Sequence, residues 1–312
     1  MAYTSGDTIL DDHYNGFATS VNTIWGTGSS VRGYGQSTTI SSVSAGTTIT
    51  ATQWSTLLDR IRSISDHQGN DASITIDTVT NPSAGDTISA LTTLATDIGT
   101  IDTSAAAATN AAGFGTAVTS NNQTTATLTG TITQTNTLTF ASANQMRYGF
   151  NAGGKVEISW NLALGTSDSK YNNWVALATA CGTYQVFANT SGKSGGSGSP
   201  TTNNTNYGFY DMSTSPATVF KQFEDTAPYT ASYIEVDVSL NAAAGSATVM
   251  TLTSKWVDAA ADQTSYNKNI YNVLDQVDGT KKTVFSWFPP ATTYLTDTWG
   301  TPTWAVTVNS HA

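Results

Sequence analysis

Apolar residues recur at the spacing of an amphipathic helix close to the start of the chain. Asp7 is placed to cap this helix, and Gly26 and Gly28 are placed to end it. The steps between successive apolar residues alternate between four and three positions, which puts them on one face. The residues of this stripe are Leu10, Tyr14, Phe17, Val21 and Ile24.

A second helix of the same kind is predicted after residues 29–50, which are typical of an extended connection. Thr50 or Thr52 can cap it, and it ends near Gly69. We expect the two helices to bury their stripes against each other as a helical hairpin over residues 1–70, with Trp25 and Trp54 as the largest side chains. The second stripe consists of Trp54, Leu57, Leu58, Ile61 and Ile64.

A third helical pattern follows a linker at residues 71–85, with Asp86 as its N-cap. Its apolar stripe is narrow, and Thr, Ala and Asp occupy the other faces. Two interpretations are open: a short coiled coil or helical stalk, and a surface helix packed on its own domain. We assign residues 71–120 to a linker and helical stalk. The stripe consists of Ile88, Leu91, Leu94, Ile98 and Ile101.

From about residue 121 the pattern changes to short alternating stretches rich in Val, Thr and aromatic residues, with turn residues between them. The segments YIEVDVSL and ATVMTLTSKWV, joined by NAAAGS, form the clearest antiparallel hairpin. Residues 190–206 are rich in Gly, Ser and Asn and are predicted to be a flexible surface loop. The predicted fold class is therefore α+β: an N-terminal helical hairpin and short helical stalk, followed by an antiparallel β-sandwich-like domain over residues 121–312.

Composition adds that this is a weakly charged chain. Asp, Glu, Lys and Arg make up 11% of its 312 residues, compared with about a quarter in an average soluble domain. Neutral hydroxyl and amide surfaces suit permanent packing, because few charges must be desolvated when neighbours meet. The composition therefore favours a part of an assembly over an enzyme, and we expect no cofactor.

Charge and hydropathy also exclude some partners and compartments. The net charge is −10 and the basic residues are scattered, which argues against nucleic acid. The sequence has no stretch of eighteen apolar residues, so it predicts no membrane span, and its first residues do not resemble a secretory signal. The single cysteine, Cys181, is expected to be buried and structural, since no base lies near it in the sequence. We expect synthesis in a cytoplasm, without export through a signal peptide.

Three groups of residues could carry chemistry, and each has a plainer explanation. Asp11-Asp12-His13 and Asp66-His67 place carboxylates beside His, but such residues at helix ends are also what the helix dipole favours. Other carboxylates of the β region include Glu157, Glu224, Asp225 and Asp258. Glu235 and Asp237 share one face of a strand, as a glycosidase pair would, but they also fit the solvent side of a half-buried strand. Trp299 and Trp304 could stack on sugars or fill a core.

Two blocks of sequence carry a family resemblance. The first comprises GDTILDDHYNGFATSVNTIWGTG, RGYGQ, VSAGTTITATQWSTLLDRI and DHQG. It resembles the opening module of virion structural proteins of tailed bacteriophages, particularly those that infect cyanobacteria. In those proteins an Ile-Trp-Gly, a Gly-Tyr-Gly and a Trp in the second helix recur in this order.

The second block is MRYGFNAGGK at residues 146–155, followed by Asn-Asn-Trp at 172–174 and Cys-Gly-Thr at 181–183. It is similar to a Tyr-Phe-Phe-Asn-Ala-Gly-Gly pattern of phage tail-associated proteins, although Gly149 stands where an aromatic residue is commoner. The residues themselves predict a sharp turn with Asn151 in the left-handed region. An aromatic cluster is expected under this turn, formed by Tyr148, Phe150, Trp160 and Trp174.

The resemblance implies a structural component of a phage particle, in its tail, fibre or baseplate, that is not an enzyme. Its expected partners are other virion proteins and copies of itself, with a trimer favoured if residues 86–103 form a seam between copies. The alternatives are a receptor- or host-glycan-binding module and a capsid decoration protein, with a polysaccharide depolymerase after them. The residues expected to serve in assembly are Tyr14, Phe17, Trp25, Trp54, Leu57, Ile61, Leu91, Leu94 and Ile98.

Overall fold

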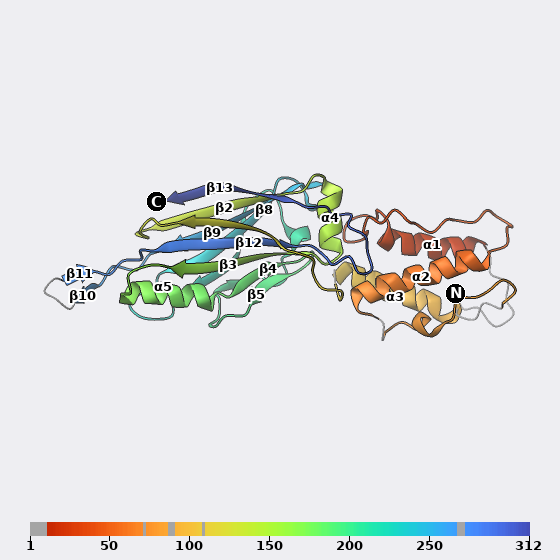
Figure 1. The fold of residues 1–312 in the computed structure, drawn as a ribbon, viewed down its shortest axis with the longest axis horizontal. Coiled ribbons are helices and arrows are strands. Elements are labelled where there is room, and N and C mark those ends of the chain that lie inside the picture. The colour runs from red at the N-terminus through yellow and green to blue at the C-terminus, as the bar shows by residue number, and fades with distance from the viewer. Residues whose placement is uncertain (1–10, 71–72, 87–90, 108–109, 267–271) are drawn as a thin grey trace. The chain divides into compact units, whose positions relative to one another are not determined.

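The computed structural model describes residues 11–70, 73–86, 91–107, 110–266 and 272–312. The chain divides into two compact units and passes between them more than once. Unit 1 consists of Met1–Thr116, Ala143–Gly154 and Pro289–Gly300; unit 2 consists of Ala117–Ser142, Lys155–Phe288 and Thr301–Ala312. Helices dominate unit 1 and antiparallel sheets dominate unit 2, so the fold is α+β as predicted (Figure 1).

Unit 1 is built on three helices that share one hydrophobic core. They are α1 (Asp11–Trp25), α2 (Ala51–Gln68) and α3 (Leu91–Ala107), with α4 (Ala143–Asn151) and a 3-10 turn at Ile76–Thr78 in the same unit. The predicted hairpin of α1 and α2 is confirmed. Thr50 is the N-cap of α2 and forms a capping box with Gln53, while Gly69 ends the helix with a left-handed φ of 74°. The predicted Asp7 cap, Leu10 and Ile88 lie outside the described residues.

The third helix corrects the prediction of a separate stalk. Leu94, Ile98 and Ile101 are buried in the same core as the stripes of α1 and α2. The narrow stripe is therefore used inside the unit, which is the second of the two interpretations that the sequence left open. Two helices leave part of their apolar surface uncovered, and α3 packs against both.

Unit 2 is a β-sandwich of two antiparallel sheets. One sheet has the order β1 (Val118–Thr124), β12 (Thr280–Phe288), β3 (Lys155–Ala163), β4 (Thr183–Val186) and β5 (Ser191–Ser194). The other has the order β13 (Thr303–His311), β2 (Thr131–Thr139), β9 (Val249–Val257), β8 (Tyr233–Leu240), β7 (Ala217–Phe223) and β6 (Thr202–Asn203). The smaller elements are β10 (Thr264–Tyr266), β11 (Asn272–Leu274), α5 (Ser169–Ala180) and 3-10 turns at Phe209–Asp211 and Ala244–Ser246.

The inner faces of the two sheets meet through aromatic rings and a layer of hydrogen bonds. Trp160 of β3 stacks on Phe220 of β7 with ring centroids 5.3 Å apart, and its indole N–H donates to Ser254 of β9 at 2.8 Å. The side-chain oxygen of Gln134 accepts hydrogen bonds from Trp256 and Thr283. These bonds satisfy polar groups that burial would otherwise leave without partners, and they fix how the sheets align.

Two local predictions in unit 2 have different outcomes. The β8–β9 hairpin is confirmed, with Glu235 opposite Lys255 in its register. Residues 190–206, expected to be a loop, contain β5 and β6. The sequence of these residues has no alternation of apolar and polar positions that would predict a strand. The two short strands form because they pair with β4 and β7.

Candidate functional site

Most of the helical residues expected to serve in assembly are core residues of unit 1. Phe17 is half-buried against the core, and the side chain of Leu91 lies outside the part that the structure describes. The guanidinium of Arg60 covers the ring of Trp25, 3.9 Å from its centroid. The buried members are Tyr14, Trp25, Trp54, Leu57, Ile61, Leu94 and Ile98. These seven side chains stabilise the unit itself, so they are not available for a seam between copies.

The two blocks of the family resemblance meet within unit 1. Arg147 of α4 donates a hydrogen bond to the carbonyl oxygen of Arg32 at 2.8 Å and another to that of Thr27. The buried Asn151 donates to the carbonyl oxygens of Ser30 and Gly33, each at 3.1 Å. The segment 27–33, which joins two pieces of the first block, is thus held by side chains of the second, which gives these motif residues a structural role.

The same contacts correct the expected turn. MRYGFN is helical, so Asn151 is not left-handed, and Gly153 takes the positive φ of 85°. Gly35 (φ 71°) must be glycine, since a Cβ there would lie 2.3 Å from the ring of Tyr148.

The predicted aromatic cluster has other partners. Trp160 stacks on Phe220 and Trp174 on Trp256, all in unit 2, whereas Tyr148 and Phe150 belong to unit 1.

His67 and Cys181 are buried structural residues. The ring Nε2 of His67 lies 2.9 Å from the carbonyl oxygen of Ala152, and burial lowers the pKa of this His to about 4. Cys181 is fully buried, and burial raises the pKa of its thiol, which disfavours the nucleophilic thiolate. Among the described residues, no three His, Cys, Asp or Glu side chains are arranged to hold a metal ion.

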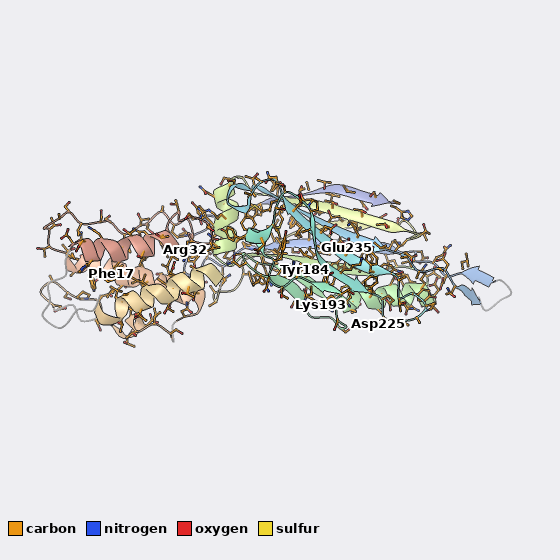
Figure 2. The ribbon with its side chains drawn as sticks, turned by 180° about the vertical axis from the view of Figure 1, so that it is seen from behind. Phe17, Arg32, Tyr184, Lys193, Asp225 and Glu235 are labelled. Atoms are coloured by element: carbon orange, nitrogen blue, oxygen red, sulfur yellow. The ribbon has the colours of Figure 1, made fainter. Side chains whose placement is uncertain are left out.

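Glu235 and Asp237 lie on one face of β8, as predicted, and form ion pairs across the sheet. The ammonium of Lys255 lies 2.9 Å from Glu235 and also contacts Asp237, and Lys221 reaches Glu235 from β7 at 3.2 Å. Figure 2 labels Glu235 on this strand. These ion pairs account for both carboxylates as cross-strand partners of lysines.

The two tryptophans considered for sugar stacking serve in packing. Trp299 is buried in the core of unit 1. The indole of Trp304 donates to the carbonyl oxygen of Val118 at 2.8 Å, and its ring packs on Phe285.

The candidate ligand site is a cavity of about 260 Å³ in unit 2, at the C-terminal end of α5. The helix, the loop 197–199 and the end of β7 each contribute to its lining. We call it the α5 cavity; it is lined by Ala176, Leu177, Ala180, Ser197, Gly198, Ser199, Gln222, Phe223, Glu224 and Asp225. Figure 2 labels Lys193 and Asp225, which lie near the loop and after β7.

Hydrogen bonds hold the wall of the α5 cavity in place. The amide of the buried Gln222 donates to the carbonyl oxygen of Ser197 at 3.1 Å and accepts from the ammonium of Lys193 at 2.8 Å. The same ammonium donates to the carbonyl oxygen of Gly198 at 3.1 Å. The backbone N–H of Ser197 bonds to the carbonyl oxygen of Ala180 at 3.0 Å, which ties the loop to the end of α5. The cavity is therefore preformed.

Glu224 is the chemically distinctive residue of this cavity. Its side chain is buried; Oε1 accepts a hydrogen bond from the backbone of Thr226 at 3.2 Å, and Oε2 has no hydrogen-bond partner among the described residues. Burial raises the pKa of this carboxyl. The sequence placed Glu224 in the β region, but no sequence signal distinguishes a buried glutamate at a strand end from a solvated one.

No protein-family model, curated protein or solved structure matches the chain. The resemblance to phage virion proteins therefore rests on the two sequence blocks alone. None of the described helices combines the length and the hydropathy that crossing a bilayer requires.

Proposed function

We propose that this chain is a structural component of a virus particle, in the tail, fibre or baseplate of a tailed phage. It is made in the host cytoplasm and assembles with other virion proteins and with copies of itself. The proposal assigns it no catalytic role and no nucleic-acid partner. It is supported by the resemblance of the two sequence blocks, by the weakly charged composition and by one exposed edge of the sandwich.

The edge strand β13 is the observation that carries the proposal. β13 ends its sheet and has β2 as its one ladder partner among the described strands. Eight of its nine positions are exposed, including Val306 at 49% and Val308 at 38%, and TWAVTVNSH contains no Lys, Pro, Asp or Glu. Soluble monomers usually protect a long edge with such residues, so an edge that lacks them favours a partner.

The edge is not equally free along its length. Asn122 of β1 donates a hydrogen bond to the carbonyl oxygen of Val308 at 2.8 Å, and a bulge interrupts the register between Val306 and Val308. We therefore expect contact through exposed side chains as well as through backbone pairing. A copy of this chain or a neighbouring virion protein with a similarly neutral surface would lose little solvation of charge in such a contact.

The basic side chains of the described residues also favour neutral contacts, because most have partners within their own unit. Arg147 binds carbonyl oxygens, Lys193 binds the loop of the α5 cavity, and Lys281 is fully buried. The ion pairs are Arg32–Asp102, Arg62–Asp59, Lys155–Glu157, Lys170–Asp258, Lys170–Asp262, Lys221–Glu235, Lys255–Glu235 and Lys255–Asp237. A charged side chain that is already paired within its own unit does not have to lose hydration when a neighbouring subunit packs against that unit.

The trimer suggested by the sequence loses its basis, because its seam residues Leu94 and Ile98 are core residues of unit 1. The proposal keeps a homo-oligomer and leaves its copy number to measurement. The α5 cavity favours the alternative of a receptor- or glycan-binding module. A capsid decoration protein would differ in being found at capsid symmetry axes.

The test replaces exposed valines of the edge with lysine. We expect the wild-type chain to be an oligomer and the double variant Val306→Lys, Val308→Lys to be a smaller species. Like charges would then face each other at every repeat of the contact. Size-exclusion chromatography with light scattering measures this mass. Leu164→Lys is the matched control, since Leu164 is 91% exposed and lies outside β13. An unchanged oligomer in the double variant would remove β13 from the proposal.

A further inference from the structure

We propose that Lys170 and Asp258 form a covalent amide bond between their side chains, with loss of one water molecule and with Asp262 as the general base. All of these residues lie in unit 2, and the inference does not depend on assembly through β13. It describes a modification that the chain makes to itself, not the turnover of a substrate.

The Lys170–Asp258 pair differs from the other ion pairs of the described residues in its burial. Nζ of Lys170 lies 2.7 Å from Oδ2 of Asp258, and the two side chains are 1% and 3% exposed. In each of the other pairs at least one side chain is 18% exposed or more. Opposite charges are costly to remove from water, whereas an amide carries no net charge. Burial therefore favours the amide over the ion pair.

The backbone holds both reacting side chains in place. Lys170 lies in the first turn of α5, which is capped by Asp168, and the same Asp168 accepts a hydrogen bond from the backbone of Gln276 at 2.9 Å. Asp258 directly follows β9, and its N–H donates to the carbonyl oxygen of Gly130 at 2.7 Å. Two groups that are held in contact react as parts of one molecule, which removes the entropic cost of bringing them together.

The reaction needs no reagent from outside the chain. A proton moves from the ammonium of Lys170 to Oδ2 of Asp258, which leaves a neutral amine beside a neutral carboxylic acid. The amine attacks Cγ of Asp258, and Asp262 takes a second proton from Nζ and passes it to Oδ2. The Cγ–Oδ2 bond then breaks and water leaves. An ammonium and a carboxylate thus become an amide and one water molecule, so atoms and charge balance.

The groups around the pair are placed to assist these steps. The carboxylate of Asp262 contacts the ammonium of Lys170, and its side chain is 38% exposed, so it joins the buried pair to solvent. The carbonyl oxygen of Ala260 accepts from Nζ at 3.1 Å and orients it. The hydroxyl of Ser232 donates to Oδ1 of Asp258 at 3.0 Å, and this is the oxygen on which negative charge develops when the amine attacks.

Burial also favours the reactive form of the acid. It raises the pKa of Asp258, towards the neutral carboxyl group. Burial lowers the pKa of Lys170, but the carboxylates of Asp258 and Asp262 raise it by more, so the ammonium is the resting form. Transfer of one proton within the pair removes both of its buried charges at once, which is why the pair itself can supply the free amine.

The bond would give the chain a covalent cross-link that is not a disulfide. Cys181 is the single cysteine of the sequence, so no disulfide can form within the chain. The amide joins the start of α5 to the end of β9 and closes the long stretch of chain between them, which restricts the unfolded state. Because no electrons are transferred, the bond can form under reducing conditions.

Intact-mass spectrometry of the purified full-length chain tests the proposal. Loss of one water molecule lowers the mass by about 18 Da, and we expect this deficit in the wild type. Lys170→Arg keeps a cation opposite Asp258 but has no amine to react, so it should have the full mass. Lys255→Arg changes a lysine of the more exposed ion pairs and should keep the deficit. A wild-type chain of full mass, or a deficit that persists in Lys170→Arg, would overturn the proposal.

Peptide mapping locates the bond without relying on a variant that must fold. After digestion of the wild type with trypsin, we expect a branched peptide that joins residues 156–193 to residues 256–268. A mass deficit carried by any other peptide would contradict the assignment to Lys170 and Asp258.

The role of Asp262 is tested by the rate of bond formation in freshly synthesised protein. Asp262→Asn should slow the appearance of the deficit by about 100-fold, as loss of a general base does, while Asp262→Glu keeps a carboxylate and should still react. Thermal unfolding shows that each variant is folded. Bond formation at the wild-type rate in folded Asp262→Asn would overturn the role given to this residue.

Discussion

His67 is a titratable residue in a position that accommodates its neutral form. Its side chain is fully buried between the ring of Tyr34, at 5.4 Å, and the carbonyl oxygen of Ala152. Desolvation lowers the pKa from 6.5 to about 4 in the folded protein. The folded state therefore binds fewer protons than the unfolded state between these two values.

This difference predicts the sign of a pH dependence. The stabilisation is fully present above pH 6.5 and is lost as the pH falls from 6.5 to about 4. The wild-type protein should lose about 3 kcal/mol more of its free energy of unfolding than His67→Gln between pH 7 and pH 4. Urea unfolding at a series of pH values measures the difference. Parallel curves for the two proteins would show that His67 titrates normally.

Arg147 and Asn151 are the residues through which α4 holds the segment 27–33. Asn151→Ala should lower the free energy of unfolding by about 2 kcal/mol, because the buried carbonyl group of Gly33 and the half-buried one of Ser30 lose a donor. Asn172→Ala is the control: Asn172 is exposed on α5, and its loss should change stability by less than about 0.5 kcal/mol. Chemical denaturation measures both. Equal effects would mean that the α4 contact contributes no specific stability.

At the scale of elements, α3 is the helix whose role distinguishes a compact unit from a stalk. Leu94→Ala should destabilise unit 1 by about 3 kcal/mol, as deletion of a fully buried leucine side chain does. Leu164→Ala removes the same atoms from a side chain that is 91% exposed, and we expect almost no change. Thermal and denaturant unfolding compare the two variants. A stable Leu94→Ala protein that dissociates into smaller species would instead indicate a seam between copies.

Elements with a strong local signal were predictable from the sequence. The stripes of α1 and α2, the Thr50 cap and the Gly69 end are set by residues close in sequence. The β8–β9 hairpin follows from alternation on both sides of one turn. In these places local preference and tertiary packing agree.

Elements that depend on distant partners were not predictable. α4 is stabilised by bonds from Arg147 and Asn151 to a segment more than a hundred residues earlier. β1 is a polar strand, VTSNNQT, that pairs with β12. The sequence of β1 has no alternation of apolar and polar residues that would predict a strand, so the strand is recognised only from its pairing with β12.

The α5 cavity could not be predicted from the sequence for a similar reason. Its lining comes from α5, from a Gly- and Ser-rich loop and from the end of β7. Glu224 stood out only as one of several carboxylates in the β region. Its burial depends on the packing of these separate segments, which the spacing of residues does not encode.

At the scale of the whole molecule, the proposed function depends on a surface that presents few unpaired charges. In the described part of the chain, most basic side chains are bound to groups of their own unit, and the nine-residue strand β13 presents neutral side chains at an edge. A surface of this kind loses little hydration of charge on contact. It suits repeated, permanent contacts between identical or neighbouring subunits.

The mass of the purified full-length chain in solution tests this account most directly. Sedimentation velocity over a wide range of concentration should show an oligomer that persists on dilution, since permanent contacts dissociate slowly. Raising the salt concentration should weaken it little, because few charges take part. A single species with the mass of one chain at every concentration would contradict the account.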